Sequence, residues 1–245
     1  MAKCFCLRSA GILLILYLIL VNLSVTAIAS ELPEPETRKI DTELPGFIEK
    51  LPRTTLRYYT TKPALTQFEV GGLIVSLNLI LVDEPIYKEL RSRDPFPREV
   101  WSSVSLIGEP SLHLAMGAVG GLLESDLGED LFFASLYNNI NTTIIKVSTG
   151  MARPSNDQSV VFQGISFDRG HMAMVSGHTS SAFAVAGVLA EHFPEWKPVL
   201  YLAAGAVGLS RIFLGEHWLS NVVLGALVGH ISTQHYLQLK EEGQP

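Results

Sequence analysis

The chain has 245 residues, of which 47% are hydrophobic and 17% charged, and its formal net charge at pH 7 is −6. This length allows one domain with a substantial apolar core. The acidic balance argues against nucleic acid as a partner, because proteins hold the phosphate backbone with clustered Lys and Arg.

Residues 1–29 have the pattern of an export signal. Lys3 and Arg8 form a basic start, an apolar run follows, and the sequence Ala-Ile-Ala at 27–29 has the small-x-small form of a cleavage site. The alternative is an uncleaved anchor, since about 20 apolar residues can cross a bilayer. We expect cleavage, because the composition then changes abruptly to Glu and Pro. The mature protein is expected in the periplasm or cell envelope, with a membrane surface as a possible partner.

Residues 30–104 are expected to form an N-terminal tether with accessory helices. The segment 31–69 is rich in Pro and charged residues, and an apolar run covers 71–82. Residues 83–98 are polar and interrupted by Pro, which favours a loop with a short helix.

Residues 105–237 are expected to form the main domain, followed by a polar tail at 238–245. Apolar residues at helical spacing predict helices over 98–123 (interrupted at Glu109-Pro110), 129–147 (closed by Gly150), 179–193, 197–209 and 217–237. Residues 151–175 show no period, which predicts a loop. Because β-periodicity is weak throughout, the predicted fold class is all-α, a helical bundle.

Three uncharged runs raise the question of membrane spans, namely 72–82, 198–209 and 218–237. The first two are shorter than the ~20 residues that a span needs. The third contains Asn, Ser, Gln and His side chains. We therefore expect helices buried around a polar site, in a protein that is soluble or peripheral rather than integral.

Three short blocks concentrate the chemistry of this chain. In the first, Lys146 and Arg153 flank Gly150. A turn at the glycine lets both cations converge on one anion, to which Arg153 offers a planar two-pronged donor. For an isolated pair, two solvated surface cations are the better explanation.

The second block is Ser176-Gly177-His178, immediately before an apolar helix. Ser176 can cap that helix, and Gly177 allows a close backbone approach. Free N–H groups at the positive helix end then form an anion site. Taken alone, the block is better explained as an ordinary capped helix with an incidental histidine.

The third block contains Ser210-Arg211, His217 and Asn221. The spacing of four predicts that His217 and Asn221 share a helix face. Asn221 would then accept the Nδ1–H of the imidazole and leave Nε2 free to attack phosphorus. A buried structural histidine is the alternative, but cations, a helix N-terminus and a held imidazole together favour a phosphoryl-transfer site.

The three blocks resemble, in order and spacing, the signature motifs of the type 2 phosphatidic acid phosphatase and vanadium haloperoxidase superfamily: Lys146-x6-Arg153-Pro154, Ser176-Gly177-His178 and Ser210-Arg211-x5-His217-x3-Asn221. The resemblance covers about residues 105–237. It implies a helical catalytic domain and a metal-independent acid phosphatase without a cofactor.

The resemblance also implies a role for each site residue. His217 would be the nucleophile and form a phosphohistidine, while His178 would protonate the leaving alkoxide and later activate water. The phosphoryl oxygens would be bound by Lys146, Arg153, Arg211, Ser176 and Gly177.

The chain departs from the family pattern at two positions. Val175 stands where the family usually has Pro, which should loosen the turn slightly. Asn221 stands where the family has Asp, so a full charge that would stabilise the imidazolium is missing. We expect a slower enzyme that an Asn221→Asp exchange accelerates. Glu216 is adjacent to His217, but we expect it to point off the helix face.

Hydrolysis of a phosphomonoester or pyrophosphate, on a phosphorylated lipid or a small phosphoester, is the leading hypothesis. Vanadate-dependent halide oxidation is an alternative, because vanadate mimics the phosphoryl transition state; it would be the cofactor there and an inhibitor of the phosphatase. A weakly active or non-catalytic member that binds phosphate or phospholipid is a further alternative, indicated by Asn221. No cluster of His, Asp and Glu has convincing metal-ligand spacing.

Overall fold

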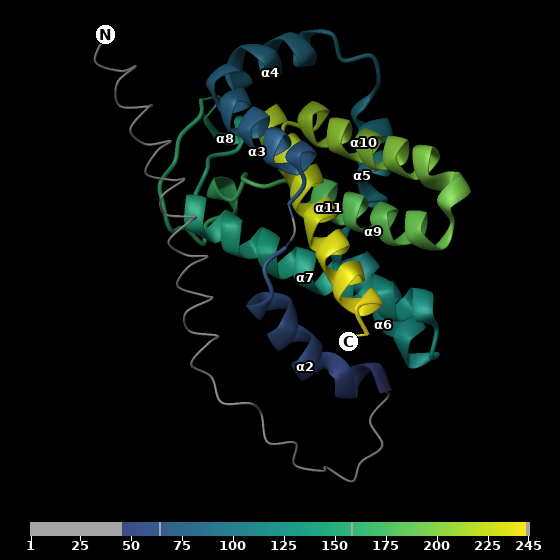
Figure 1. Ribbon diagram of the computed structural model, residues 1–245. Coiled ribbons are helices and arrows are strands. Elements are labelled where there is room, and N and C mark those ends of the chain that lie inside the picture. Colours follow the sequence, from purple (N-terminus) through teal and green to yellow (C-terminus); the bar gives the residue numbers. More distant parts are fainter. Residues whose placement is uncertain (1–45, 64, 158, 244–245) are drawn as a thin grey trace. The chain divides into compact units, whose positions relative to one another are not determined.

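The structure is a computed structural model that describes residues 46–63, 65–157 and 159–243. The expected export signal and its cleavage site lie outside these residues. Within them the regular secondary structure is helical, with one isolated β-bridge between Met151 and Phe162, which confirms the all-α prediction (Figure 1). The α-helices are α2 (Gly46–Thr60), α3 (Gln67–Leu79), α4 (Asp83–Ser92), α5 (Arg98–Leu106), α6 (Pro110–Leu122), α7 (Asp126–Thr149), α8 (Pro154–Asp157), α9 (Gly177–His192), α10 (Lys197–Phe213) and α11 (Leu219–Glu241).

The chain divides into two compact units. One comprises residues up to Pro63 together with those from Leu239 onward, and α2 belongs to it. The other is Ala64–Gln238, which contains all three sequence blocks.

Helix packing in the larger unit follows chain order, with α6 against α7, α7 against α9, and α9 against α10, which also packs on α5. Glycines allow the closest approaches. A Cβ on Gly120 of α6 would lie 2.6 Å from the Cα of Gly128 in α7, so these two helix backbones touch. A Cβ on Gly225 of α11 would lie 2.8 Å from the carbonyl oxygen of Ser176, which sets the start of α9 against α11.

The helix boundaries that matter most are specified locally. The side chain of Ser125 caps α7 by accepting from the backbone N–H of Gly128, and Ser176 caps α9 by accepting from that of Thr179. Gly150 ends α7 in the left-handed region at φ 53°. A Cβ there would collide with the carbonyl oxygen of Gly164, so glycine is required both for the turn and for the space.

Four helix ends meet at one end of this bundle. α7 and α10 end there, whereas α9 and α11 begin there. The contact is direct, since the backbone N–H of Ser176 donates to the carbonyl of Asn221 at 3.0 Å. The Lys146 ammonium lies only 3.1 Å from the place that a Cβ of Gly177 would occupy. The three blocks are thus brought together by helix antiparallelism, because each lies at a helix end.

The short helix expected within 83–98 is present as α4, in which Pro85 falls in the first turn, where a missing N–H costs no helical hydrogen bond. Both sequence-based boundaries of the last helix are wrong. Helix α11 begins at Leu219, so His217 lies in the preceding turn and not on the helix. The α11 helix also continues to Glu241, into the segment expected to be a polar tail.

The larger unit exposes many large apolar side chains. Helix α3 is not the buried helix expected for the run at 72–82, since Ile74 is 56% and Val75 53% exposed. Further exposed residues lie on α6 and α10: Leu112, Met116, Val119, Leu122, Val199, Leu202 and Leu209. Among the described residues, one helical segment, Glu69–Ser92, is long and apolar enough to cross a membrane.

Candidate active site

His217 lies at the centre of the convergent helix ends and is almost completely buried, with 2% of its surface exposed. Its Nδ1 lies 2.7 Å from the carbonyl oxygen of Ala173. A carbonyl can only accept, so Nδ1 carries the hydrogen and Nε2 is left as the atom with a free lone pair. Burial lowers the pKa of His217 well below its usual value, and the charges of Lys146, Arg153 and Arg211 lower it further. The imidazole is therefore neutral across the physiological range.

Asn221 does not hold His217, contrary to the sequence-based expectation. Its Oδ1 accepts from the backbone N–H of Trp218 at 3.1 Å, and its Nδ2 lies 3.1 Å from the sulfur of Met151. The physical reason is the position of the helix start, because a polar side chain in the first turn of α11 folds back onto the unpaired N–H groups. Asn221 is thus a cap, and the carbonyl of Ala173 has the orienting role.

Lys146, in the last turn of α7, has an ammonium group with no hydrogen bond or ion pair to any described residue. Burial lowers its pKa to about 8, and the charges of Arg153 and Arg211 contribute in the same direction. Gly177 leaves room for this group beside the first turn of α9. The fold therefore keeps a cation in an unfavourable place with its donors unused.

Arg211, near the end of α10, is only partly satisfied. One terminal nitrogen donates to the hydroxyl of Ser105 at 2.6 Å, but the buried Nε has no hydrogen-bond partner. Leaving such a donor unpaired costs about 1–3 kcal/mol. An orphaned guanidinium N–H beside His217 is the feature expected of a site whose ligand is an anion.

Arg153 is held by backbone carbonyls and by one carboxylate. Its Nε donates to the carbonyl of Arg169 at 2.9 Å, and a terminal nitrogen pairs with Glu216. The same carboxylate lies 3.7 Å from a terminal nitrogen of Arg211. Glu216 therefore bridges the two guanidinium groups rather than pointing away, because it lies in the turn before α11 and not on the helix.

The start of α9 supplies the second histidine. Ser176 is fully buried, and its hydroxyl accepts from both the N–H and, at 2.7 Å, the hydroxyl of Thr179. This leaves the Ser176 hydrogen available to a ligand. The Nε2 of His178 lies 3.1 Å from a carboxylate oxygen of Glu109. Burial lowers the pKa of His178 to about 4, Arg211 and Lys146 lower it as well, and Glu109 opposes them.

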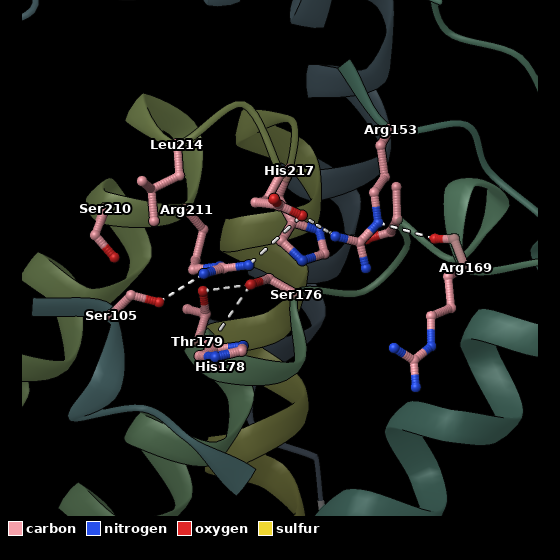
Figure 2. A network of polar contacts seen from close by, with 12 residues as sticks. Ser105, Arg153, Arg169, Ser176, His178, Thr179, Ser210, Arg211, Leu214 and His217 are labelled. Carbon is pink, nitrogen blue, oxygen red and sulfur yellow. Dashed lines mark hydrogen bonds and ion pairs between the residues drawn. The ribbon is translucent and has the colours of Figure 1, made fainter. Parts of the chain in front are cut away.

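Figure 2 shows Arg153 and Arg211 reaching toward His217 from opposite sides, with Ser176 and His178 on the first turn of α9 nearby. Three cations, a helix N-terminus and a neutral imidazole thus surround one position. Positioned cations and dipoles of this kind stabilise the charge that develops on a transferred phosphoryl group. Among the described residues, no group of three or more His, Cys, Asp and Glu side chains could hold a metal ion.

Sequence reasoning placed the motif side chains at one site but missed three partners. Ser105, Glu109 and the carbonyl of Ala173 lie outside the blocks and contact Arg211, His178 and His217, respectively. No local pattern marks them, because each contact depends on how a loop or helix distant in sequence packs against the site.

Residues 129–243 match the profile of the PAP2 superfamily. The match confirms the resemblance that the three motifs indicated: these residues are similar to the PAP2 superfamily. Curated relatives include the lipid A 1-phosphatases of Rhizobium johnstonii and Rhizobium etli, each 26% identical over 125 residues. These matches cover 50% of this chain and 51% and 54% of the relatives, so the chain spans about half the length of the curated relatives it matches.

Two solved structures have the same fold. LpxE of Aquifex aeolicus aligns over 64% of this chain and 95% of its own length, with a TM-score of 0.52 and 21% identity. The first transmembrane PAP2 type phosphatidylglycerolphosphate phosphatase from Bacillus subtilis aligns over 71% of this chain and 96% of its own length, with a TM-score of 0.53 and 21% identity. The helical bundle is therefore the PAP2 fold.

Proposed function

We propose that this protein is a phosphatase that transfers the phosphoryl group of a lipid phosphate to His217 and then to water. The proposal rests on one observation. The buried imidazole of His217 is neutral and has a fixed tautomer, and it lies beside Lys146 and Arg211, two cationic groups with unused hydrogen-bond donors. Such a site gains stability when a dianion enters, and it presents a nucleophile to that anion.

In the first step, Nε2 of His217 attacks phosphorus in line with the leaving oxygen. The P–N bond forms while the P–O bond breaks, and His178 gives a proton to the departing alkoxide. Lys146, Arg153 and Arg211 neutralise the equatorial oxygens, with Ser176 and the N–H of Gly177 as further donors. The Ala173 carbonyl holds the Nδ1 hydrogen as His217 becomes cationic, so this step does not depend on an acid at position 221.

In the second step, water attacks the phosphohistidine. His178 takes a proton from the water as the new P–O bond forms, and the P–N bond breaks to release neutral His217 and inorganic phosphate. No metal ion is needed for charge balance, because three protein cations face the phosphoryl group.

The proposed substrate class is a phosphate or pyrophosphate on a lipid. The curated relatives are lipid A 1-phosphatases, and one of the two solved structures is a phosphatidylglycerolphosphate phosphatase, so both names specify a phosphorylated lipid as substrate. The loop that carries Arg169 also bears two exposed apolar side chains, Ile165 at 69% and Phe167 at 81% exposure. A substrate with acyl chains would meet these side chains while its phosphate enters the site.

Exposed apolar side chains support membrane association. Large apolar residues are exposed on α3, α6 and α10, and monomeric soluble proteins rarely expose large apolar patches. Tight glycine contacts between α6 and α7 are also typical of helices that pack in lipid. We place the protein in the cell envelope with Glu69–Ser92 as its candidate span, and assign catalysis to residues 105–237.

The test is phosphate release by the purified protein in detergent with EDTA present. Short-chain phosphatidic acid, a polyprenyl diphosphate and an aryl phosphate would be compared, with His217→Ala as control. We expect EDTA-resistant release that the variant abolishes, and inhibition by vanadate. Peroxide-dependent halogenation on adding vanadate would instead favour a haloperoxidase. Phosphate binding without release of phosphate from any substrate would mark a binding protein.

A further inference from the structure

We propose that Glu109 is a positioning residue that orients His178 and keeps it able to carry a proton. The inference rests on the proposed function and adds a residue to its machinery. Glu109 lies outside all three motifs, in the loop between α5 and α6. One of its carboxylate oxygens is 3.1 Å from Nε2 of His178.

The loop holds Glu109 firmly in this place. The other carboxylate oxygen accepts from the hydroxyl of Ser111 at 2.7 Å, and the backbone carbonyl accepts from the N–H of His113 at 3.2 Å. His113 in turn lies 2.7 Å from the hydroxyl of Ser181 on α9. The start of α6 is therefore tied to the same helix that carries His178.

Gly108 brings the loop directly onto the backbone of His178. A Cβ at this position would lie 2.6 Å from the carbonyl oxygen of His178 and 2.5 Å from Cγ1 of Val207. Only glycine allows this approach. Because Glu109 follows immediately, the close contact fixes its carboxylate beside the imidazole.

The charges around His178 come from three parts of the fold. Arg211 on α10 and Lys146 on α7 disfavour the imidazolium, in addition to burial, whereas Glu109 favours it. His113 on α6 also faces Glu109, and burial lowers its pKa below the usual value. The pKa of Glu109 itself is lowered, first by its hydrogen bond with Ser111. Within the described part of the chain, Glu109 is thus an ionised group that opposes the local cations.

The pair fixes which nitrogen performs the chemistry. A carboxylate only accepts, so Nε2 of His178 carries a hydrogen, and Nδ1 has no partner among the described residues. Protonated Nδ1 can then give its proton to the leaving oxygen as the P–O bond breaks. Neutral Nδ1 can take a proton from the water that attacks phosphorus. Glu109 stays ionised and stabilises the imidazolium on both occasions.

The leaving group provides the sharpest test. A lipid phosphate releases an alkoxide that needs a proton, whereas 4-nitrophenyl phosphate releases a stable phenolate. For Glu109→Gln we expect kcat on short-chain phosphatidic acid to fall about tenfold or more, with about twofold change on the aryl ester. The alkaline limb of the pH profile should move to lower pH, because loss of the carboxylate lowers the pKa of His178. Glu109→Asp should restore part of the rate, and Glu99→Gln, an exposed acid on α5, is the matched control.

Equal losses on both esters with an unchanged pH profile would mean that Glu109 is only structural, and would overturn the inference. A second measurement works without turnover, namely NMR titration of His178 in the wild type and in Glu109→Asp and Glu109→Gln. A lower pKa of His178 in the Gln variant supports the role of Glu109, and an unchanged pKa refutes it. If wild type releases phosphate from neither ester, the proposed function fails, and the titration still decides the inference.

Discussion

Buried polar side chains lie at both ends of helices α7 and α9, but they are paired at one end and partly unpaired at the other. At one end, the Asp130 carboxylate lies 2.8 Å from Nε2 of His192 and accepts from the Tyr236 hydroxyl at 2.8 Å. At the other end, the Lys146 ammonium has no partner among the described residues and Arg211 keeps a buried donor unpaired. His178 and His192, near the two ends of α9, are about 21 Å apart, from the helical rise over fourteen residues. Charged groups that pair with one another stabilise the bundle, whereas charged donors left unpaired at a cost in stability mark the place for an anionic ligand. The buried Ser135 hydroxyl on α7 is also unpaired, but it is neutral.

The largest expected effect is at His217. The His217→Ala variant should lose at least about a thousandfold in kcat, because no other described side chain is placed to attack phosphorus. The melting temperature should fall as well, because truncation of this buried ring leaves a cavity and removes the hydrogen bond to the Ala173 carbonyl, so kcat is compared at a temperature where the variant is fully folded. Steady-state kinetics and thermal unfolding check the two parts. Residual turnover within tenfold of wild type would exclude a phosphohistidine on this residue.

Removing the charge of Lys146 should raise the stability of the protein and lower its activity. Lys146→Met keeps the alkyl packing and removes a charge whose pKa is lowered to about 8 in the folded state. The folded state disfavours the protonated form, so the destabilisation is complete below pH 8 and is relieved as the pH rises toward 10.5. At pH 7 the variant should gain up to about 3 kcal/mol in unfolding free energy and lose about a hundredfold in kcat.

The check for Lys146 is urea unfolding at pH 7 and pH 10, together with phosphate release. The stability gain should shrink at pH 10, where the wild-type ammonium is mostly deprotonated in the folded state. A variant that is less stable than wild type at both pH values would show that Lys146 has a structural partner, and the contrast between the two ends would fail.

Much of this contrast was accessible from the sequence, because its signals are local. Ser176 and Gly150 predicted a helix start and a helix end, and those boundaries place two blocks at one end of the bundle. The placement of His217 was wrong because helix period alone does not show that Asn221 folds back to cap α11. The contacts of Glu109 and Ser105 could not be predicted, since they depend on how α5 and α6 pack against helices more than 60 residues further along the chain.

Replacing Glu216 tests whether its carboxylate occupies the anion site when no substrate is present. It bridges Arg153 and Arg211, the two guanidinium groups proposed to bind phosphate. Since both side chains of the Arg153 pair are partly exposed, the bridge is worth up to about 1 kcal/mol. Glu216→Gln should therefore bind inorganic phosphate up to about fivefold more tightly, as measured by its inhibition constant. Weaker binding would mean that Glu216 orients the guanidinium groups instead of competing with the ligand.

Asn221→Asp should raise kcat by only about threefold, because the carbonyl of Ala173 already accepts the Nδ1 hydrogen of His217. The exchange should also lower the melting temperature. The Asn221 amide lies 3.3 Å from the hydroxyl of Ser220, which is bound at 2.5 Å to the buried carboxylate of Asp83. A second carboxylate here faces the first across one hydroxyl. Adding Asp83→Asn should restore part of the lost stability in a double-mutant cycle, and additive effects would contradict this coupling.

The smallest effect on activity is expected at the opposite end. Tyr236→Phe removes a hydroxyl that donates to Asp130, a carboxylate that is only 2% exposed. Leaving a buried carboxylate short of one donor should cost about 1–3 kcal/mol in unfolding free energy. The kcat should stay within about twofold of wild type, because no proposed site residue contacts Tyr236. Thermal unfolding and kinetics on the same preparation check both values. A large fall in kcat with unchanged stability would show that the polar cluster at this end is coupled to the site. The presence of unpaired donors would then fail to distinguish the functional end of the bundle from the structural end.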